Sequence, residues 1–144
     1  MSPGGSVGPV LMFSVPGRRG LGHVMRGLNV AREVRALRPD ARCVFATRGA
    51  AARQVIADEF EVIVLDHADA RTPAEVAANQ VRPDIVVHDT ALPGDVRVAA
   101  REAYVLRRSG RARQAEVLAA PVLRRMDVVL VPHSTGELAS NHQT

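Results

Sequence analysis

The sequence predicts an α/β protein: a three-layer Rossmann-like domain with a mostly parallel, doubly wound sheet. Short aliphatic runs alternate with segments of helical periodicity along most of the chain. Aromatic residues make up only 3% of the sequence and Trp is absent, so the core must be aliphatic, as in buried parallel strands. Right-handed crossovers between parallel strands then place helices on both faces of the sheet.

The length fits one domain, because 144 residues can bury a sizeable core. We expect a Rossmann-like domain over residues 8–133, preceded by a flexible N-terminus over residues 1–7. Residues 134–144 are polar and are expected to form a tail.

The first half of the chain predicts a strand–helix–strand–helix–strand unit. Apolar residues recur at helical spacing after the first strand, with arginines between them. The expected strands are Gly8–Val15, Arg42–Thr47 and Glu61–Leu65, and the expected helices are Gly22–Leu37 and Ala50–Glu59.

A third helix is predicted from Pro73 to Val81. Thr72 is a good N-cap, and Glu75 completes a capping box three residues later. Proline suits the first helical position. Pro83 follows the helix and prevents its continuation.

The remainder is less regular. A fourth strand is expected at Asp84–His88 and a short helix at Val96–Glu102. The next segment, Ala103–Arg107, fits either a fifth strand or a continuation of that helix. The last elements are a helix over Arg111–Arg125, interrupted at Pro121, and a strand over Asp127–Val131.

The charge pattern argues against nucleic acid as a partner. The net charge is +4, and eight of the 19 arginines lie between Arg97 and Arg125. They are interspersed with Glu and Ala, and the aromatic residues on which bases stack are nearly absent. Peripheral contact with an anionic membrane stays open for this segment.

Cysteine content and hydropathy limit the classes of protein to which the chain can belong. The single cysteine, Cys43, excludes an internal disulfide and a thiolate metal site and is expected to be buried in a strand. We expect no metal and no cofactor. No stretch is long enough to span a membrane, and no signal peptide precedes the first strand, so we expect a cytoplasmic protein.

The loop PGRRGLGH joins the first strand to the first helix. Gly20 and Gly22 permit positive φ and close approach of a ligand, and His23 begins a helix whose N–H groups favour anions or oxyanions. The third glycine of GxGxxG and the Gly-Lys-Ser/Thr of a Walker A loop are both missing. A tight turn with an incidental exposed histidine is the alternative interpretation.

A second candidate follows the fourth strand, in the stretch VVHDT. In a doubly wound sheet the first and fourth strands are neighbours at the switch point, so His23 and Asp89 are expected to overhang one crevice. A carboxylate fixes the tautomer of an imidazole and raises its basicity, and the imidazole can then take a proton from a hydroxyl. The alternative for Asp89 is a turn cap. His88 is expected to point the other way as a structural residue, and His133 to be solvated.

Several segments resemble the N-terminal half of GT-B glycosyltransferases, in the branch that contains the N-acetylglucosaminyltransferase of lipid II synthesis and related bacterial proteins. The resemblance covers roughly residues 8–133. It rests on Gly20, Gly22 and His23, on Thr47-Arg48-Gly49, on RPDIVVHDT and on RQAEVLAAPVLRRMDVVLVPH. The loop departs from the family pattern, because Pro16-Gly17-Arg18-Arg19 replaces a small, glycine-rich start.

The resemblance implies an acceptor-binding domain that works with a second domain or chain holding the nucleotide-sugar donor, without a metal. It assigns the catalytic base to His23 by motif and a helper role to Asp89 by topology. Substrate contacts are expected from the loop residues and from the residue after the aspartate, namely Arg18, Arg19, Gly20, Leu21, Gly22 and Thr90. Residues 8–133 alone are expected to be inactive, because they lack the donor site that stabilises the leaving group.

Two further classes stay open. A small phosphate- or nucleotide-binding module would use the N-terminus of the first helix as an anion site. A non-catalytic interaction domain would use Arg97–Arg125 as a contact face for a partner subunit, a second copy of the chain or a membrane surface.

Overall fold

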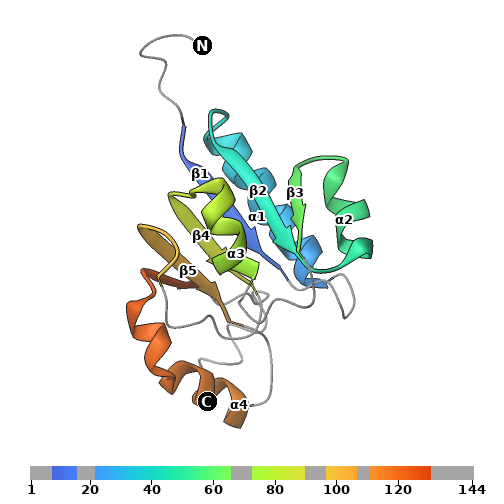
Figure 1. The fold of residues 1–144 in the computed structure, drawn as a ribbon. Helices are drawn as coiled ribbons and strands as arrows, with labels where there is room; N and C mark the ends of the chain where they lie inside the picture. Colours follow the sequence, from blue (N-terminus) through green and yellow to red (C-terminus); the bar gives the residue numbers. More distant parts are fainter. Residues whose placement is uncertain (1–7, 16–21, 66–72, 90–96, 107–110, 131–144) are drawn as a thin grey trace.

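The structure, a computed structural model, describes residues 8–15, 22–65, 73–89, 97–106 and 111–130 (Figure 1). Within these ranges, six strands form one sheet in the order β3-β2-β1-β4-β5-β6, and every neighbouring pair is parallel. The arrowheads of the strands therefore point to the same end of the sheet (Figure 1). The chain order reverses beside β1, which makes the sheet doubly wound and confirms the predicted fold class.

The elements follow one another as alternating strands and helices up to β4. The strands are β1 (Val10–Ser14), β2 (Arg42–Thr47), β3 (Glu61–Val64), β4 (Ile85–His88), β5 (Arg101–Val105) and β6 (Val128–Leu130). The helices are α1 (Gly22–Leu37), α2 (Ala50–Ala57), α3 (Pro73–Val81), α4 (Arg111–Ala119) and the 3₁₀-helix η1 (Pro121–Arg125).

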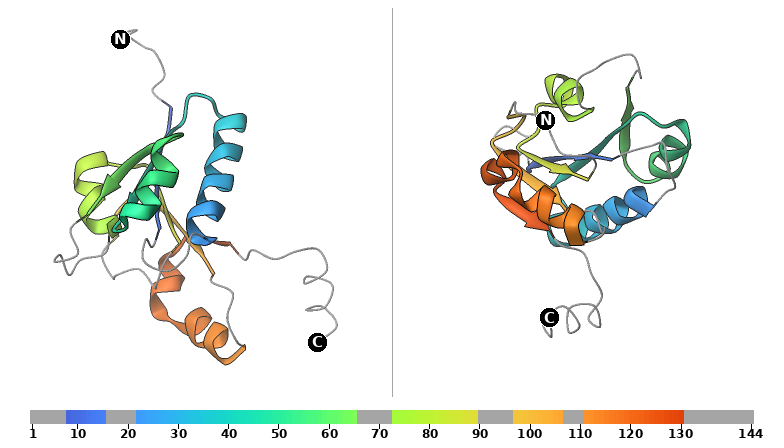
Figure 2. Two further views of the ribbon diagram at one scale, coloured as in Figure 1. Left: turned by 90° about the vertical axis from the view of Figure 1, so that its right-hand side faces the viewer. Right: turned by 90° about the horizontal axis from the view of Figure 1, so that it is seen from below.

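Helices α1 and α2 cover one face of the sheet (Figure 2). The rings of Phe13 and Phe45, from β1 and β2, stack beneath α1 with their centroids 4.9 Å apart. Gly27 lets α1 approach them closely, because a Cβ at this position would lie 3.1 Å from a ring carbon of Phe45. Since side chains alternate along a strand, the odd-numbered residues of β1 and β4 face this layer.

Helix α3 covers the opposite face (Figure 2), where Ala74 and Ala77 pack against Met12 and Val86. The helix ends as the sequence predicts. Arg82 follows it with a φ of 53° and donates its backbone N–H to Ala78, a left-handed cap before the proline. A third apolar cluster packs α4 and η1 against β5 through Tyr104, Leu106, Val117 and Leu123.

The predicted helix over Val96–Glu102 is wrong. Residues 97–100 are not helical, and Arg101 and Glu102 begin β5. The strand alternative for the following segment is correct for Ala103–Val105. Pairing with β4 and β6 supplies backbone hydrogen bonds over several residues, and this long-range pairing overrides the local preference of an Ala- and Arg-rich segment.

Smaller differences lie at element ends. The chain between Arg111 and Arg125 divides into α4 and η1 on either side of Ala120, as Pro121 predicts.

Cys43 is buried, and burial raises the pKa of its thiol. The expected N-cap Thr72 and the terminal segments 1–7 and 134–144 lie outside the described residues. None of the described helices is both long and apolar enough to cross a membrane.

Glu59 joins the first two helices by accepting hydrogen bonds from Arg32 and Arg35, and these hold the pKa of its carboxyl down to about 2. An ordinary glutamate has a pKa of 4.5, so the unfolded chain takes up a proton first. We expect the contribution of Glu59 to stability to be complete above pH 4.5 and to disappear as the pH falls toward 2. Urea unfolding of the wild type and Glu59→Gln should show a difference at pH 7 that shrinks in acid. A constant difference would contradict the pairing.

Candidate functional site

The carboxyl ends of β1 and β4 lie side by side where the strand order reverses. Ser14, the last residue of β1, is the register partner of His88, the last residue of β4. The backbone N–H of Asp89 donates to the carbonyl of Ser14 over 2.9 Å, which fixes Asp89 directly after the strand. Helix α1 begins on the same side of the sheet as the Asp89 side chain, so its first turn reaches this edge.

His23 and Asp89 meet as the sequence predicts. The Nδ1 atom of His23 lies 2.7 Å from Oδ1 of Asp89, although 66 positions separate the two residues. The Asp89 side chain is 3% exposed and that of His23 is 20% exposed. The carboxylate is thus enclosed, while the imidazole keeps access to solvent.

Arg26 completes the arrangement and was not among the predicted site residues. Its Nε lies 3.0 Å from Oδ2 of Asp89 and its Nη2 lies 2.5 Å from Oδ1, which is a bidentate ion pair. The same Nη2 is 3.1 Å from Nδ1 of His23. The spacing His23-x-x-Arg26 contained a signal, since residues three apart share one face of a helix.

These contacts determine the protonation pattern. The guanidinium of Arg26 donates to both oxygens of Asp89, and a carboxylate only accepts hydrogen bonds. Nδ1 of His23 therefore carries a proton and donates a hydrogen bond to Asp89, and in the neutral imidazole the second ring nitrogen, Nε2, is an acceptor. An imidazole oriented in this way can remove a proton from a hydroxyl group.

A pocket of about 230 Å³ adjoins the ion pair, between α1 and the sheet. Its polar lining comes from Arg26 and Asp89. The rest of its lining is mostly apolar and consists of Phe13, Gly27, Val30, Val87, Val105 and Leu130. The pocket can therefore hold a small apolar group while a polar group faces the ion pair.

The other predicted site residues fall into two groups. Gly22 starts α1 with a φ outside the left-handed region, and a Cβ there would meet nothing within 4 Å among the described atoms. Gly22 therefore does not use the positive φ that glycine permits, whereas its open surroundings among the described atoms agree with close approach of a ligand. The remaining candidates, Arg18, Arg19, Gly20, Leu21, Thr90 and His133, lie outside the described residues.

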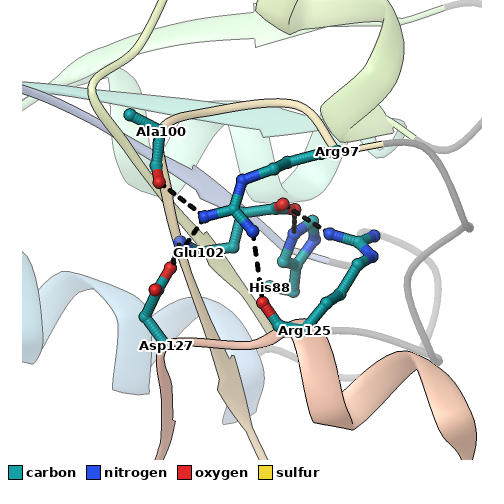
Figure 3. A network of polar contacts seen from close by, with 6 residues as sticks. All are labelled: His88, Arg97, Ala100, Glu102, Arg125 and Asp127. Atoms are coloured by element: carbon teal, nitrogen blue, oxygen red, sulfur yellow. Dashed lines mark hydrogen bonds and ion pairs between the residues drawn. The ribbon is translucent and has the colours of Figure 1, made fainter.

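A second polar cluster lies on the opposite face of the sheet (Figure 3). His88 points away from Asp89, as predicted, and its Nε2 lies 2.8 Å from Oε1 of Glu102 on β5. Arg125 of η1 forms an ion pair with the other oxygen of Glu102. His88 and Glu102 are 2% and 1% exposed, so this cluster is part of the interior.

The environment of His88 favours its neutral form. Burial lowers the pKa of His88, and Arg125 acts in the same direction. The carboxylates of Glu102 and of Glu75, on α3, oppose this effect but do not reverse it. The Glu102 carboxylate, paired with Arg125, accepts the hydrogen bond, so Nε2 of the neutral His88 carries the proton and Nδ1 is an acceptor.

The arginines at the C-terminal end do not all face a partner. Arg97 bonds to the carbonyls of Ala100 and Arg125 and to Asp127, and Arg125 itself is paired with Glu102 (Figure 3). Arg97 and Arg125 are thus bound to groups of the same fold, which weakens the hypothesis that Arg97–Arg125 forms a cationic contact face. Within the described ranges, no three His, Cys, Asp or Glu side chains gather in a group that could hold a metal ion.

No family model matches the sequence, and neither a curated protein nor a solved structure is significantly similar to it. The fold and the site nevertheless define a class. The chain is a Rossmann-like α/β protein with a histidine–aspartate–arginine cluster at its switch point.

We expect Arg26→Met to destabilise the protein by about 2–3 kcal/mol, because it leaves the buried Asp89 carboxylate with His23 alone. Methionine retains the apolar stem of the side chain, so the change tests the charge. Arg32→Met is the matched control on the same helix, since its partner Glu59 is 29% exposed, and a much smaller loss is expected. Urea denaturation measures both variants, and equal losses would contradict a special role for Arg26.

His88→Gln tests the neutral histidine. The folded-state pKa of His88 lies below 6.5, the value of an ordinary histidine. As the pH falls, the unfolded wild type therefore binds a proton before the folded protein does. The free energy of unfolding of the wild type then decreases below pH 6.5, by at most about 1.4 kcal/mol per pH unit. The variant lacks this loss. We expect its stability deficit at pH 8 to shrink between pH 6.5 and 5, a range above that in which Glu59 titrates. A deficit that grows in this range would mean that the folded state holds His88 charged.

Proposed function

We propose that the chain is the acceptor-binding domain of a nucleotide-sugar-dependent glycosyltransferase. The observation that carries the proposal is the 2.7 Å contact between His23 and Asp89 at the start of α1, on the edge where doubly wound sheets bind ligands. The resemblance of the Gly-x-Gly-His loop and of RPDIVVHDT to GT-B glycosyltransferases supplies the reaction. The donor would be bound by a second domain or a separate chain.

In the proposed reaction, the hydroxyl oxygen of the acceptor attacks the anomeric carbon of the sugar. Nε2 of His23 takes the hydroxyl proton as the new C–O bond forms. The bond between the sugar and the nucleoside diphosphate breaks, and the diphosphate leaves with the electron pair. Asp89 stabilises the resulting imidazolium, and Arg26 holds the Asp89 carboxylate in position.

The pocket beside the ion pair supports an acceptor with both polar and apolar parts. A hydroxyl held near His23 would lie next to a cavity whose lining is largely apolar. Gly22 would allow the acceptor to approach the first turn of α1, since its surroundings are open.

A phosphate- or nucleotide-binding module is the alternative. The first turn of α1 has no acidic residue, which favours an anion at the helix N-terminus. The carboxylate of Asp89 nevertheless lies against this turn and would repel a phosphate group. Arg26, the nearest described cation, is already bound to that carboxylate. The neutral hydroxyl acceptor is therefore favoured over the anion.

A binding screen tests the proposal on the full chain. Immobilised hydroxyl-bearing compounds, such as a glycan and glycolipid array, provide the acceptor probes, and UDP-, GDP- and TDP-sugars and inorganic phosphate provide the anionic ones. We expect saturable binding of at least one hydroxyl compound, and a loss of roughly tenfold or more with His23→Ala, because one hydrogen bond to the ligand disappears.

Gly22→Ala provides the second arm of this screen. The added methyl group would meet no atom of the described residues within 4 Å, so folding should be unaffected while a ligand at the first turn is obstructed. Glu59→Gln is the control for acceptor binding, because Glu59 pairs with Arg32 and Arg35 near the C-terminal end of α1. Tight binding of a nucleotide sugar or of phosphate by the chain alone, lost with Gly22→Ala, would contradict the acceptor domain and favour the anion-binding module.

A further inference from the structure

Two buried polar atoms at the switch point have no hydrogen-bond partner in the described part of the chain: Oγ of Ser14 and Nδ1 of His88. The two residues are register partners on adjacent parallel strands, so their side chains leave the same face of the sheet. Ser14 is fully buried and His88 is 2% exposed. An unpaired buried polar atom costs about 1–3 kcal/mol, so two neighbouring ones need an explanation.

The chemistry of the pair is defined by the cluster behind it (Figure 3). The Glu102 carboxylate, paired with Arg125, accepts a hydrogen bond from Nε2–H of His88, which leaves Nδ1 of the neutral ring as an acceptor. The hydroxyl of Ser14 can donate or accept. A group that both donates to Nδ1 and accepts from Ser14 Oγ would satisfy both atoms, and a hydroxyl group does so.

We infer that Ser14 and His88 form a second ligand contact at the switch point, which binds a neutral hydroxyl group of the bound molecule. This inference rests on the proposed function insofar as it takes the ligand to be a hydroxyl-bearing acceptor. His88 and Asp89 are consecutive residues with side chains on opposite faces, so this contact lies at the same strand end as His23 but on the α3 side of the sheet.

The same contact selects against anions. A carboxylate oxygen has no proton to donate to Nδ1, and the Glu102 carboxylate on the other side of the imidazole disfavours a second anion, phosphate included. The ligand class is therefore a neutral polyol or sugar with at least two hydroxyl groups. One hydroxyl would serve as the reacting group at His23, and another would be held by Ser14 and His88.

Nitrogen-15 NMR of the histidine side chains tests this inference, because Nδ1 of His88 and Nε2 of His23 give separate resonances. The full chain is titrated with N-acetylglucosamine, methyl glucoside and myo-inositol, and with inorganic phosphate as the anionic control. At least one neutral compound is expected to shift the Nδ1 signal of His88 saturably, in the direction of an acceptor that gains a hydrogen bond. Phosphate should leave it unchanged.

Ser14→Ala and Thr47→Val form a matched pair of variants. Both remove a fully buried hydroxyl at the carboxyl end of a central strand, but the Thr47 hydroxyl already accepts a hydrogen bond from the Gly49 N–H, 3.3 Å away. Ser14→Ala is expected to weaken polyol binding about tenfold, while the melting temperature of the free protein stays the same or rises. Thr47→Val should leave polyol binding unchanged.

The outcomes separate this inference from the proposed function. A His23 signal that responds to polyols while the His88 signal does not would overturn the second contact alone. Silence of both signals would overturn both proposals. A Ser14→Ala variant with a lower melting temperature and unchanged polyol binding would mean that the two atoms hold a structural water molecule, which also overturns the inference.

Discussion

The parallel pairing of β1 with both β2 and β4 is the constraint on which the other features depend. It places the carboxyl ends of β1 and β4 next to each other and brings the start of α1 to the same edge. Asp89, one residue beyond β4, then lies within hydrogen-bonding distance of the first two turns of α1. Without this pairing, residues 66 positions apart in the chain would not meet.

The alternation of side chains along β4 divides the edge into two polar environments. Asp89 faces α1 and carries a negative charge that Arg26 neutralises, while His88 faces the interior and is neutral beside the Glu102–Arg125 pair. Each carboxylate is thus bound to an arginine and to a histidine, and each histidine has its tautomer fixed by the carboxylate. The two histidines differ in access: His23 keeps solvent contact, whereas His88 is enclosed.

Much of this arrangement could be predicted from the sequence because its signals are local. Helical periodicity and the glycine before His23 predicted α1, and the aliphatic run before Asp89 predicted β4. The contact between His23 and Asp89 followed from the topology rule for doubly wound sheets. β5 was less predictable, because its pairing with β4 and β6 is long-range and its composition favours a helix. Arg26 was missed although its spacing from His23 places it on the same face of the helix, whereas Glu102, one of 15 acidic residues, has no distinguishing local signal.

The balance of charge at the edge limits the ligand that it can bind. Asp89 and Glu102 are negative, and the arginines nearest to them, Arg26 and Arg125, are already engaged with these carboxylates. The described groups proposed to contact a ligand are neutral ones: Nε2 of His23, Nδ1 of His88 and the Ser14 hydroxyl. Such groups recognise hydroxyls through hydrogen bonds in both directions and gain little from a phosphate. Neutral groups at this edge favour the proposed role in binding the acceptor of a sugar transfer over a role in binding a charged donor.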